Sequence, residues 1–157
     1  MEKINRLIID ARPLTDKKAG VARYIENIAK YWKDSGFEIV LISNSEINTY
    51  LPYRKKIYKL FRFIPGTIFI SLILPIFLRK NDVFWGTCHS IPFYRINSVL
   101  TIHDLVSLKY PQYLSWSNRV MNQLFLKKSI IKAYRLISVS KFTSLELEAI
   151  TNKSQFE

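Results

Sequence analysis

Two residues able to do chemistry, His103 and Asp104, stand side by side directly after a short apolar run, residues 99–102 (VLTI). The run is rich in β-branched residues and too short for an ordinary helix, which predicts a strand buried on both faces, as in a parallel sheet. In open α/β sheets the ligand-binding groups lie beyond the carboxyl ends of the strands. His103 could therefore act as a catalytic base, position a substrate, or be a core histidine held by its neighbours.

A second set of candidate residues follows the first apolar run of the chain, residues 7–9: Arg12, Gly20, Arg23 and Tyr24. A glycine between a strand and a helix lets backbone N–H groups approach a phosphate at the helix N-terminus. The planar guanidinium of arginine can bind two phosphate oxygens at once. A dinucleotide-binding fingerprint needs three glycines, however, and Gly20 stands alone. An ordinary loop glycine and solvated loop arginines are the alternatives.

Metal chemistry has little support in the sequence. Cys88, the only cysteine, and His89 precede His103, but no CxxC or HxxxH spacing joins them. The chain also lacks an Asp-x-Asp pair that could hold a divalent ion on a nucleotide diphosphate. We therefore expect no metal and no cofactor. A single cysteine excludes an intrachain disulfide, which suits a reducing compartment.

The elements that would position these residues alternate in type along the chain. Their spacing predicts helices at 21–32, 67–78, 118–134 and 142–150, strands at 7–9, 37–42, 82–85, 99–102 and 136–139, and an edge-like strand at 57–63. In the helix at 118–134, the expected sheet-facing side chains are Val120, Leu124, Ile130, Ile131 and Tyr134, and the solvent-facing ones Lys127, Lys128 and Lys132. Because strands alternate with helices, we predict an α/β fold: a Rossmann-like parallel sheet with helices on both faces.

Composition limits the class of protein. A chain of 157 residues is expected to form one domain, and a hydrophobic content of 48% excludes disorder. The 24 Lys and Arg against 12 Asp and Glu give a formal charge of +12, which attracts nucleic acid, acidic lipid headgroups or a phosphorylated substrate. No groove-reading motif is present, so we do not expect nucleic acid as a partner. The N-terminus lacks a secretory leader, which favours a cytoplasmic location.

The most hydrophobic stretch, residues 63–78, is shorter than the about 20 residues of a spanning helix and is interrupted by Pro65-Gly66 and Pro75. Basic residues flank it: Arg54, Lys55, Lys56, Lys59 and Arg62 before, Arg79 and Lys80 after. Basic residues beside apolar ones are typical of proteins that lie on anionic membranes. A core helix with solvated ends is the other interpretation.

Four segments occur in an informative order: IIDARPLTDKKAGVARYIENI, DVFWGTCHSIP, SVLTIHDLVSLKYP and RLISVSKFTSLEL. With these segments, which cover most of residues 6–148, the chain resembles the N-terminal domain of family-4 retaining glycosyltransferases of the GT-B fold. The resemblance implies one half of a GT-B fold. It also implies transfer of a sugar from a nucleotide-sugar donor to a glycan or lipid-linked acceptor, with retained configuration and without a metal.

The resemblance also implies roles for single residues. The segment Ala19-Gly20-Val21 would lie close to the donor phosphates and the acceptor. His103 would contact the transferred sugar near the reacting carbon, where it orients the sugar and stabilises charge. We accordingly predict His103 and Asp104 as catalytic residues, and as donor- or acceptor-binding residues Arg12, Gly20, Val21, Arg23, Tyr24 and His89. Ala22 departs from the pattern, because many relatives have a second glycine there.

We expect residues 1–150 to form this acceptor-side domain and residues 151–157 a truncated tail, with the donor-binding C-terminal domain and its E-x7-E glutamates absent. Glu38 and Glu46 have that spacing but flank the second predicted strand, so we interpret the match as coincidence. The leading hypothesis is half of a hexosyl- or mannosyltransferase-like enzyme of polysaccharide biosynthesis, inactive alone and peripheral to the cytoplasmic membrane face. The alternative is a non-catalytic, truncated or split product that binds a membrane, or a partner chain through an unpaired sheet edge.

Overall fold

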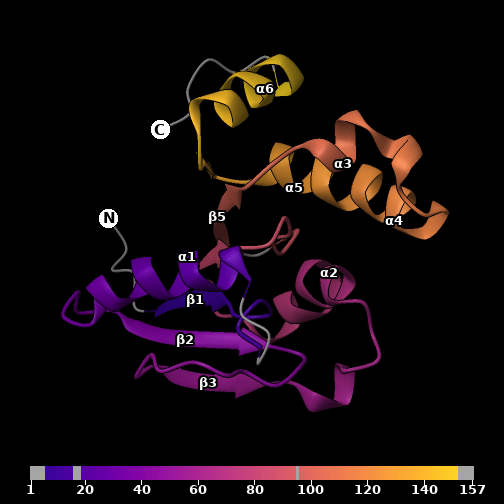
Figure 1. The fold of residues 1–157 in the computed structure, drawn as a ribbon. Coiled ribbons are helices and arrows are strands. Elements are labelled where there is room, and N and C mark those ends of the chain that lie inside the picture. Colours follow the sequence, from indigo (N-terminus) through magenta and orange to yellow (C-terminus); the bar gives the residue numbers. More distant parts are fainter. Residues whose placement is uncertain (1–5, 16–18, 95, 152–157) are drawn as a thin grey trace.

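The computed structural model describes residues 6–15, 19–94 and 96–151, which fold around a six-stranded sheet (Figure 1). The strands are β1 (Arg6–Asp10), β2 (Glu38–Ser43), β3 (Arg54–Ile57), β4 (Asp82–Gly86), β5 (Asn97–Ile102) and β6 (Arg135–Ser138). All neighbours pair in parallel, in the order β3-β2-β1-β4-β5-β6. The predicted α/β fold with a Rossmann-like parallel sheet is confirmed.

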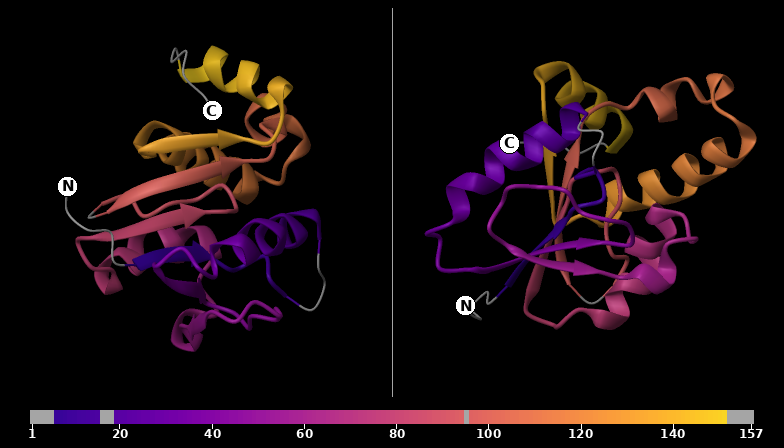
Figure 2. Two further views of the ribbon diagram at one scale, coloured as in Figure 1. Left: turned by 90° about the vertical axis from the view of Figure 1, so that its left-hand side faces the viewer. Right: turned by 60° about the horizontal axis from the view of Figure 1, so that its bottom comes forward.

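Helical segments lie on both faces of this sheet (Figure 2). They are α1 (Gly20–Ala29), η1 (Lys30–Trp32), η2 (Lys59–Phe61), α2 (Gly66–Ile68), η3 (Phe69–Ile73), η4 (Leu74–Phe77), α3 (Val106–Lys109), η5 (Pro111–Tyr113), α4 (Trp116–Met121), η6 (Asn122–Leu126), α5 (Lys127–Lys132) and α6 (Lys141–Thr151). Several run on without a break: α2, η3 and η4 form one helical stretch, as do α4, η6 and α5.

The sheet separates two apolar cores because consecutive side chains of a strand point to opposite faces. Ile8 lies in the first core with side chains from η3, η4 and α5, whereas Ile9 lies in the second core with side chains from α1. Both are buried. A strand covered on both faces can be apolar at every position, which is why the short continuous apolar runs predict these strands correctly.

The edge strand was predicted at the wrong residues. We expected it at 57–63, but β3 spans Arg54–Ile57 and η2 follows within the expected range. The three basic residues that begin β3 are exposed, as is common on edge strands, where charge discourages pairing with another chain. Exposed charges of this kind resemble a loop in the sequence.

The helical stretch from α4 to α5 agrees with the prediction in its range but not in its buried side. Leu124, Ile131 and Tyr134 are exposed, whereas Leu126 and Ile130 are buried against the sheet. The segment η6 is a π-helical turn, which takes more residues per turn than an α-helix and therefore rotates the buried side. The predicted exposure of the lysines of α5 is confirmed.

The strand order places a topological switch point between β1 and β4. From β1 the chain builds outward through β2 to β3, and it then returns to β4 on the other side of β1. In sheets of this kind, ligands bind beyond the carboxyl ends of the strands at such a point. The loops that follow β1, β4 and β5 are therefore the place to look for a site.

Candidate functional site

The loop after β1 is anchored by a buried ion pair between Asp10 and Arg12. The carboxylate of Asp10, which is fully buried, accepts hydrogen bonds from Arg12 Nε at 2.8 Å and Arg12 Nη2 at 2.6 Å. Nη2 also donates to the Cys88 carbonyl oxygen at 3.2 Å and to Ser90 Oγ. Burial alone would lower the pKa of Arg12, but the charge and hydrogen bonds of Asp10 raise it above its usual value. The pair therefore ties the loop after β1 to the loop after β4.

Two glycines make room for this arrangement. A Cβ on Gly86, the last residue of β4, would lie 2.5 Å from the Ser90 carbonyl oxygen, so the loop can fold back only because no side chain is present. A Cβ on Gly66, the first residue of α2, would lie 2.7 Å from Arg12 Nη1. Arg12 is thus enclosed by its neighbours, and the side of the guanidinium expected to bind phosphate is occupied by Asp10. Its role in ligand binding stays a prediction.

His103 lies at the carboxyl end of β5 and is half-buried rather than sealed in the core. Its Nε2 is 3.1 Å from the Thr87 carbonyl oxygen. Because a carbonyl oxygen only accepts, Nε2 carries a proton, and in the neutral ring Nδ1 is then the acceptor. The ring of Tyr24, from α1, meets the imidazole edge-on with 5.2 Å between ring centroids. These contacts hold the imidazole in one orientation.

Thr87 links this histidine to the buried ion pair. Its side chain donates from Oγ1 to the Asp10 carbonyl oxygen at 2.7 Å, while its own carbonyl accepts from His103. Thr87, Asp10 and Ser90 are not among the site residues predicted from the sequence. Asp10 does carry a usable signal, since it directly follows a buried run just as His103 does. Thr87 and Ser90 carry none, because their roles depend on contacts between residues far apart in the chain.

His89 combines three unusual features. It is the only residue other than glycine with a positive φ (56°) in residues 6–15, 19–94 and 96–151. Its Nε2 is buried without a hydrogen-bond partner among those residues. Burial lowers the pKa of His89 below its ordinary value of 6.5, against the opposing charge of Asp104. Its ring centroid lies 6.2 Å from that of His103. Strained backbone and unpaired polar atoms cluster at functional sites.

The remaining predicted residues occupy the start of α1 and the turn after His103. Gly20 is the first residue of α1, and the Ala19 N-cap supplies no side-chain hydrogen bond. Val21 is half-buried, and Arg23 is exposed. Asp104 is exposed, and its Oδ1 accepts from the Val106 amide at 3.1 Å. Asp104 therefore shapes the turn into α3.

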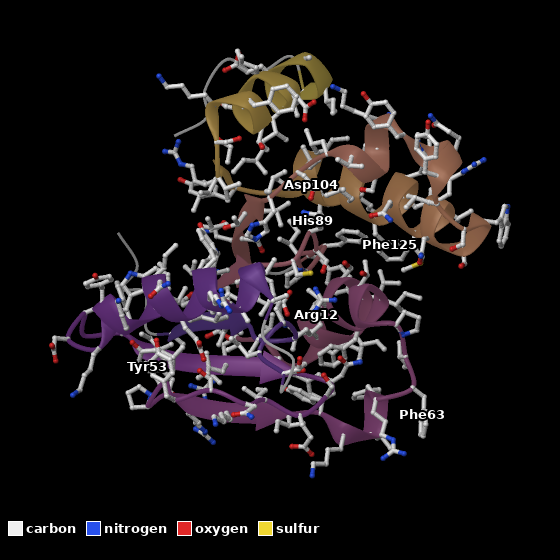
Figure 3. The ribbon with its side chains drawn as sticks, in the orientation of Figure 1. Arg12, Tyr53, Phe63, His89, Asp104 and Phe125 are labelled. Carbon is white, nitrogen blue, oxygen red and sulfur yellow. The ribbon has the colours of Figure 1, made fainter. Side chains whose placement is uncertain are left out.

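The structure brings Arg12, Tyr24, His89, His103 and Asp104 to one edge of the sheet. Figure 3 shows Arg12, His89 and Asp104 in the central part of the molecule. No three His, Cys, Asp or Glu side chains in the described part of the chain are placed to hold a metal ion. The predicted ligand-binding and catalytic roles of these residues stay predictions.

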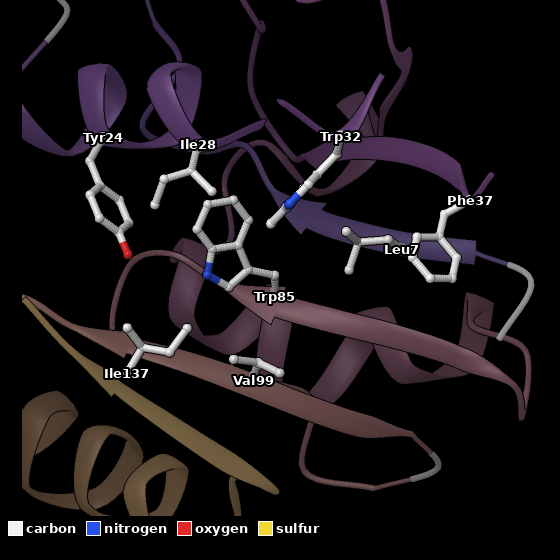
Figure 4. A pocket seen from close by; sticks show the side chains of 8 residues that line it. All are labelled: Leu7, Tyr24, Ile28, Trp32, Phe37, Trp85, Val99 and Ile137. Atoms are coloured by element: carbon white, nitrogen blue, oxygen red, sulfur yellow. The ribbon is translucent and has the colours of Figure 1, made fainter. Parts of the chain in front are cut away.

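An apolar groove of about 310 Å³ adjoins this edge on the α1 side of the sheet (Figure 4). It is lined by Leu7, Tyr24, Ile28, Trp32, Phe37, Trp85, Val99 and Ile137. Tyr24 lies between the groove and His103. The groove also leaves Val99 only half-buried, so β5 is less covered on this face than we expected. Its apolar walls do not suit sugar hydroxyls or phosphate, which need polar partners.

A model of the family described as Glycosyltransferase Family 4 matches residues 19–153. The chain belongs to glycosyltransferase family 4. A search of curated proteins found no match. The family-4 match covers the start of α1, the loop with His89, and the pair His103 and Asp104, but it begins after Asp10 and Arg12. In this family-4 domain, an oriented imidazole and a strained second histidine thus share the carboxyl edge of the sheet with an uncapped helix N-terminus.

Proposed function

We propose that this family-4 domain forms the acceptor side of the cleft of a retaining, hexosyl- or mannosyltransferase-like glycosyltransferase. It would transfer a sugar from a nucleotide-sugar donor to a glycan or lipid-linked acceptor in polysaccharide biosynthesis. The observation that supports this proposal best is the fixed imidazole of His103 at the carboxyl end of β5. The family match supports the general class of the reaction.

The contacts of His103 suggest its part in the transfer. With Nε2 donating to the Thr87 carbonyl, Nδ1 is left to accept a hydrogen bond from a sugar hydroxyl. Sugar transfer passes through an oxocarbenium-like transition state, in which hydrogen bonds to the sugar hydroxyls strengthen. A ring already oriented by Thr87 and Tyr24 need not reorganise during the reaction, which is the basis of electrostatic preorganisation.

The start of α1 would face the phosphates of the nucleotide sugar. An α-helix N-terminus offers free backbone N–H groups and a partial positive charge, which together favour anions. The first turn of α1 contains no acidic residue that would oppose a phosphate. Arg23, exposed in the same turn, would add a positive charge.

A transfer assay on the chain combined with a separately supplied donor-binding C-terminal domain tests the proposal, with His103→Gln as the key variant. Glutamine can still donate to the Thr87 carbonyl, but its acceptor is a flexible amide oxygen in place of the fixed ring Nδ1 that would face the sugar. We expect turnover to fall by about 100-fold or more, with an unchanged unfolding midpoint. His89→Gln reports on the second histidine, and Tyr31→Ser, at an exposed position after α1, is the control.

Turnover within about threefold of the parent for His103→Gln would overturn the role of this residue. The assay is repeated without the second domain, because a domain that holds only the acceptor side should turn over negligibly. Robust transfer by the isolated chain would contradict the proposal that it forms only one side of the cleft.

A further inference from the structure

The helical stretch from α2 to η4 is neither a wholly buried helix nor a free surface helix. Phe69, Ile70 and Leu74 are buried in the first core, so the core interpretation is right for one side. The other side, with the neighbouring segment after β3, exposes large apolar side chains: Leu60 (86% exposed), Phe63 (83%), Ile76 (60%), Phe77 (41%) and Leu72 (40%). We call these five residues the apolar patch. Among the described residues, no helix is long and apolar enough to span a membrane.

Ring contacts make the two segments of the apolar patch continuous. Phe77, from η4, packs against Phe61, from η2, with 6.1 Å between centroids, and against Tyr58 with 5.0 Å. Leu60 precedes Phe61 in the chain, Phe63 follows it by two residues, and both side chains are exposed. Figure 3 shows Phe63 at the outer margin of the molecule.

The charge around the apolar patch is mainly positive, although two of its basic residues are paired: Lys59 Nζ lies 3.0 Å from Glu46 Oε1, and Arg54 Nη1 lies 3.6 Å from Glu38 Oε1. From Arg54 to Lys80 the chain contains seven basic residues and no acidic residue. Two of the basic groups lie directly over aromatic rings: Arg62 is 4.5 Å from the Phe63 ring centroid, and Lys56 is 5.0 Å from that of Tyr58. Basic side chains with apolar stems beside exposed rings can reach lipid phosphates while the rings enter the boundary with the acyl chains.

We propose that the apolar patch docks on an anionic lipid surface. The patch side chains would enter the headgroup region, and the basic residues around them would contact lipid phosphates. Nucleic acid fits less well, because three of the five patch side chains are aliphatic and cannot stack on bases as aromatic rings do. A second copy of the chain fits less well too, because two surfaces of the same positive charge repel each other.

Docking in this way brings the candidate site close to the membrane. Figures 1 and 3 share one orientation, in which β2 and β3 point toward the side where α2 and the labelled Phe63 lie, so the Phe63 part of the apolar patch lies at the carboxyl end of the sheet. A Cβ built on Gly66, at the start of α2, would lie 2.7 Å from Arg12 Nη1, so the start of α2 lies next to the candidate site. If the proposed function holds, a lipid-linked acceptor would present its sugar from that side. The docking itself does not depend on catalysis.

Flotation with vesicles of phosphatidylcholine, alone or mixed with phosphatidylglycerol, tests the proposal without any nucleotide sugar. We expect binding to the phosphatidylglycerol vesicles that weakens as salt is raised. The double variant Leu60→Ser and Phe63→Ser should bind about tenfold or more weakly, because each replaced side chain contributes apolar area to the lipid. Both positions are so exposed that folding should be unchanged, which circular dichroism verifies.

Tyr31→Ser is the matched control, since Tyr31 is also an exposed ring (78%) with a cation, Lys30, 5.0 Å from its centroid. It follows α1, away from the apolar patch, and its loss should leave vesicle binding unchanged. The proposal is overturned by absent binding to anionic vesicles at low salt, or by equal losses in the control and the double variant. A third result would also overturn it: the parent chain binds an RNA duplex tightly, and the double variant loses affinity for the RNA but not for the vesicles. Loss of transfer activity alone would bear only on the proposed function.

Discussion

Two halves of the same sheet edge differ in how well their polar groups are satisfied. In the half formed by Asp10 and Arg12, the buried carboxylate is matched by a guanidinium that also binds two groups of the β4 loop. In the half formed by His89 and His103, one ring nitrogen is buried without a described partner and one backbone is strained. The first half thus holds the loops together, whereas the second contains a ring nitrogen that could still form a hydrogen bond with a ligand.

This difference separates scaffold from ligand-facing groups more clearly than residue type does. Arginine at a strand end suggests phosphate binding, yet Arg12 donates its hydrogen bonds to Asp10 of the same chain. Histidine is often a satisfied core residue, yet Nε2 of His89 has no hydrogen-bond partner among the residues that the structure describes. Unsatisfied groups and strain cost stability, and they persist where function requires them. Substitutions in the two halves should therefore change stability in opposite directions.

Arg12→Met should have the largest effect on stability. It leaves the fully buried carboxylate of Asp10 without a counter-charge, and breaking such a pair costs about 3–5 kcal/mol. Urea unfolding followed by circular dichroism measures the loss. The double variant Asp10→Asn and Arg12→Met should recover most of it, because no charge then remains buried. A loss below about 1 kcal/mol for the single variant would show that this half is not scaffold.

Gly86→Ala should come next. Its Cβ would lie 2.5 Å from the Ser90 carbonyl oxygen, a backbone atom that cannot rotate away, so we expect a loss of about 1–3 kcal/mol. Gly20→Ala is the matched control: none of the described neighbours lies within 4 Å of a Cβ built there, and alanine favours the helix that begins at this position. Equal unfolding midpoints for the two variants would contradict the tight return of the loop onto β4.

The sheet could be predicted from the sequence because its inner strands are short apolar runs. β1, β2 and β4 are buried on both faces, so periodicity alone finds them. β3 escaped the prediction because an edge strand needs only one neighbour and can carry exposed charges, as this one does. The buried side of α4 to α5 escaped it because the π-helical turn of η6 leaves no signal in the hydrophobic spacing.

Without the family resemblance, the rule on strand ends indicates only those candidate residues that directly follow a strand. His103 stands at such a position, and the rule that ligands bind beyond strand ends found it. The contact that orients it could not be predicted, because the Thr87 carbonyl comes from another loop. The sequence alone also could not reveal that Arg12 forms hydrogen bonds with the Asp10 carboxylate, or that His89 adopts a positive φ. Each of these depends on how the loops meet in space.

His89→Gly tests whether a substitution in the half formed by His89 and His103 leaves unfolding stability unchanged or raises it, in contrast to the loss expected for Arg12→Met. The left-handed backbone costs a non-glycine residue about 1–2 kcal/mol, and glycine removes that cost together with the unpaired nitrogen. Part of the gain is offset by the greater freedom of glycine in the unfolded chain. We expect unfolding stability unchanged or raised by up to about 1 kcal/mol, with weaker sugar transfer. If stability instead fell by more than about 1 kcal/mol, the histidine would belong to the scaffold.

The pH dependence of unfolding should show the smallest effect, and it also comes from His89. Burial lowers the pKa of His89 in the folded chain, so below its ordinary value of 6.5 the unfolded chain binds this proton more readily than the folded one. The contribution of His89 to stability is therefore present above pH 6.5 and is lost as the pH falls from there toward the lowered pKa. Urea unfolding from pH 7.5 down to 5 should show a decline for the parent chain that is smaller for His89→Gln. The same decline in both proteins would mean that this imidazole is as well solvated folded as unfolded, and the contrast between the two halves would then depend on backbone strain alone.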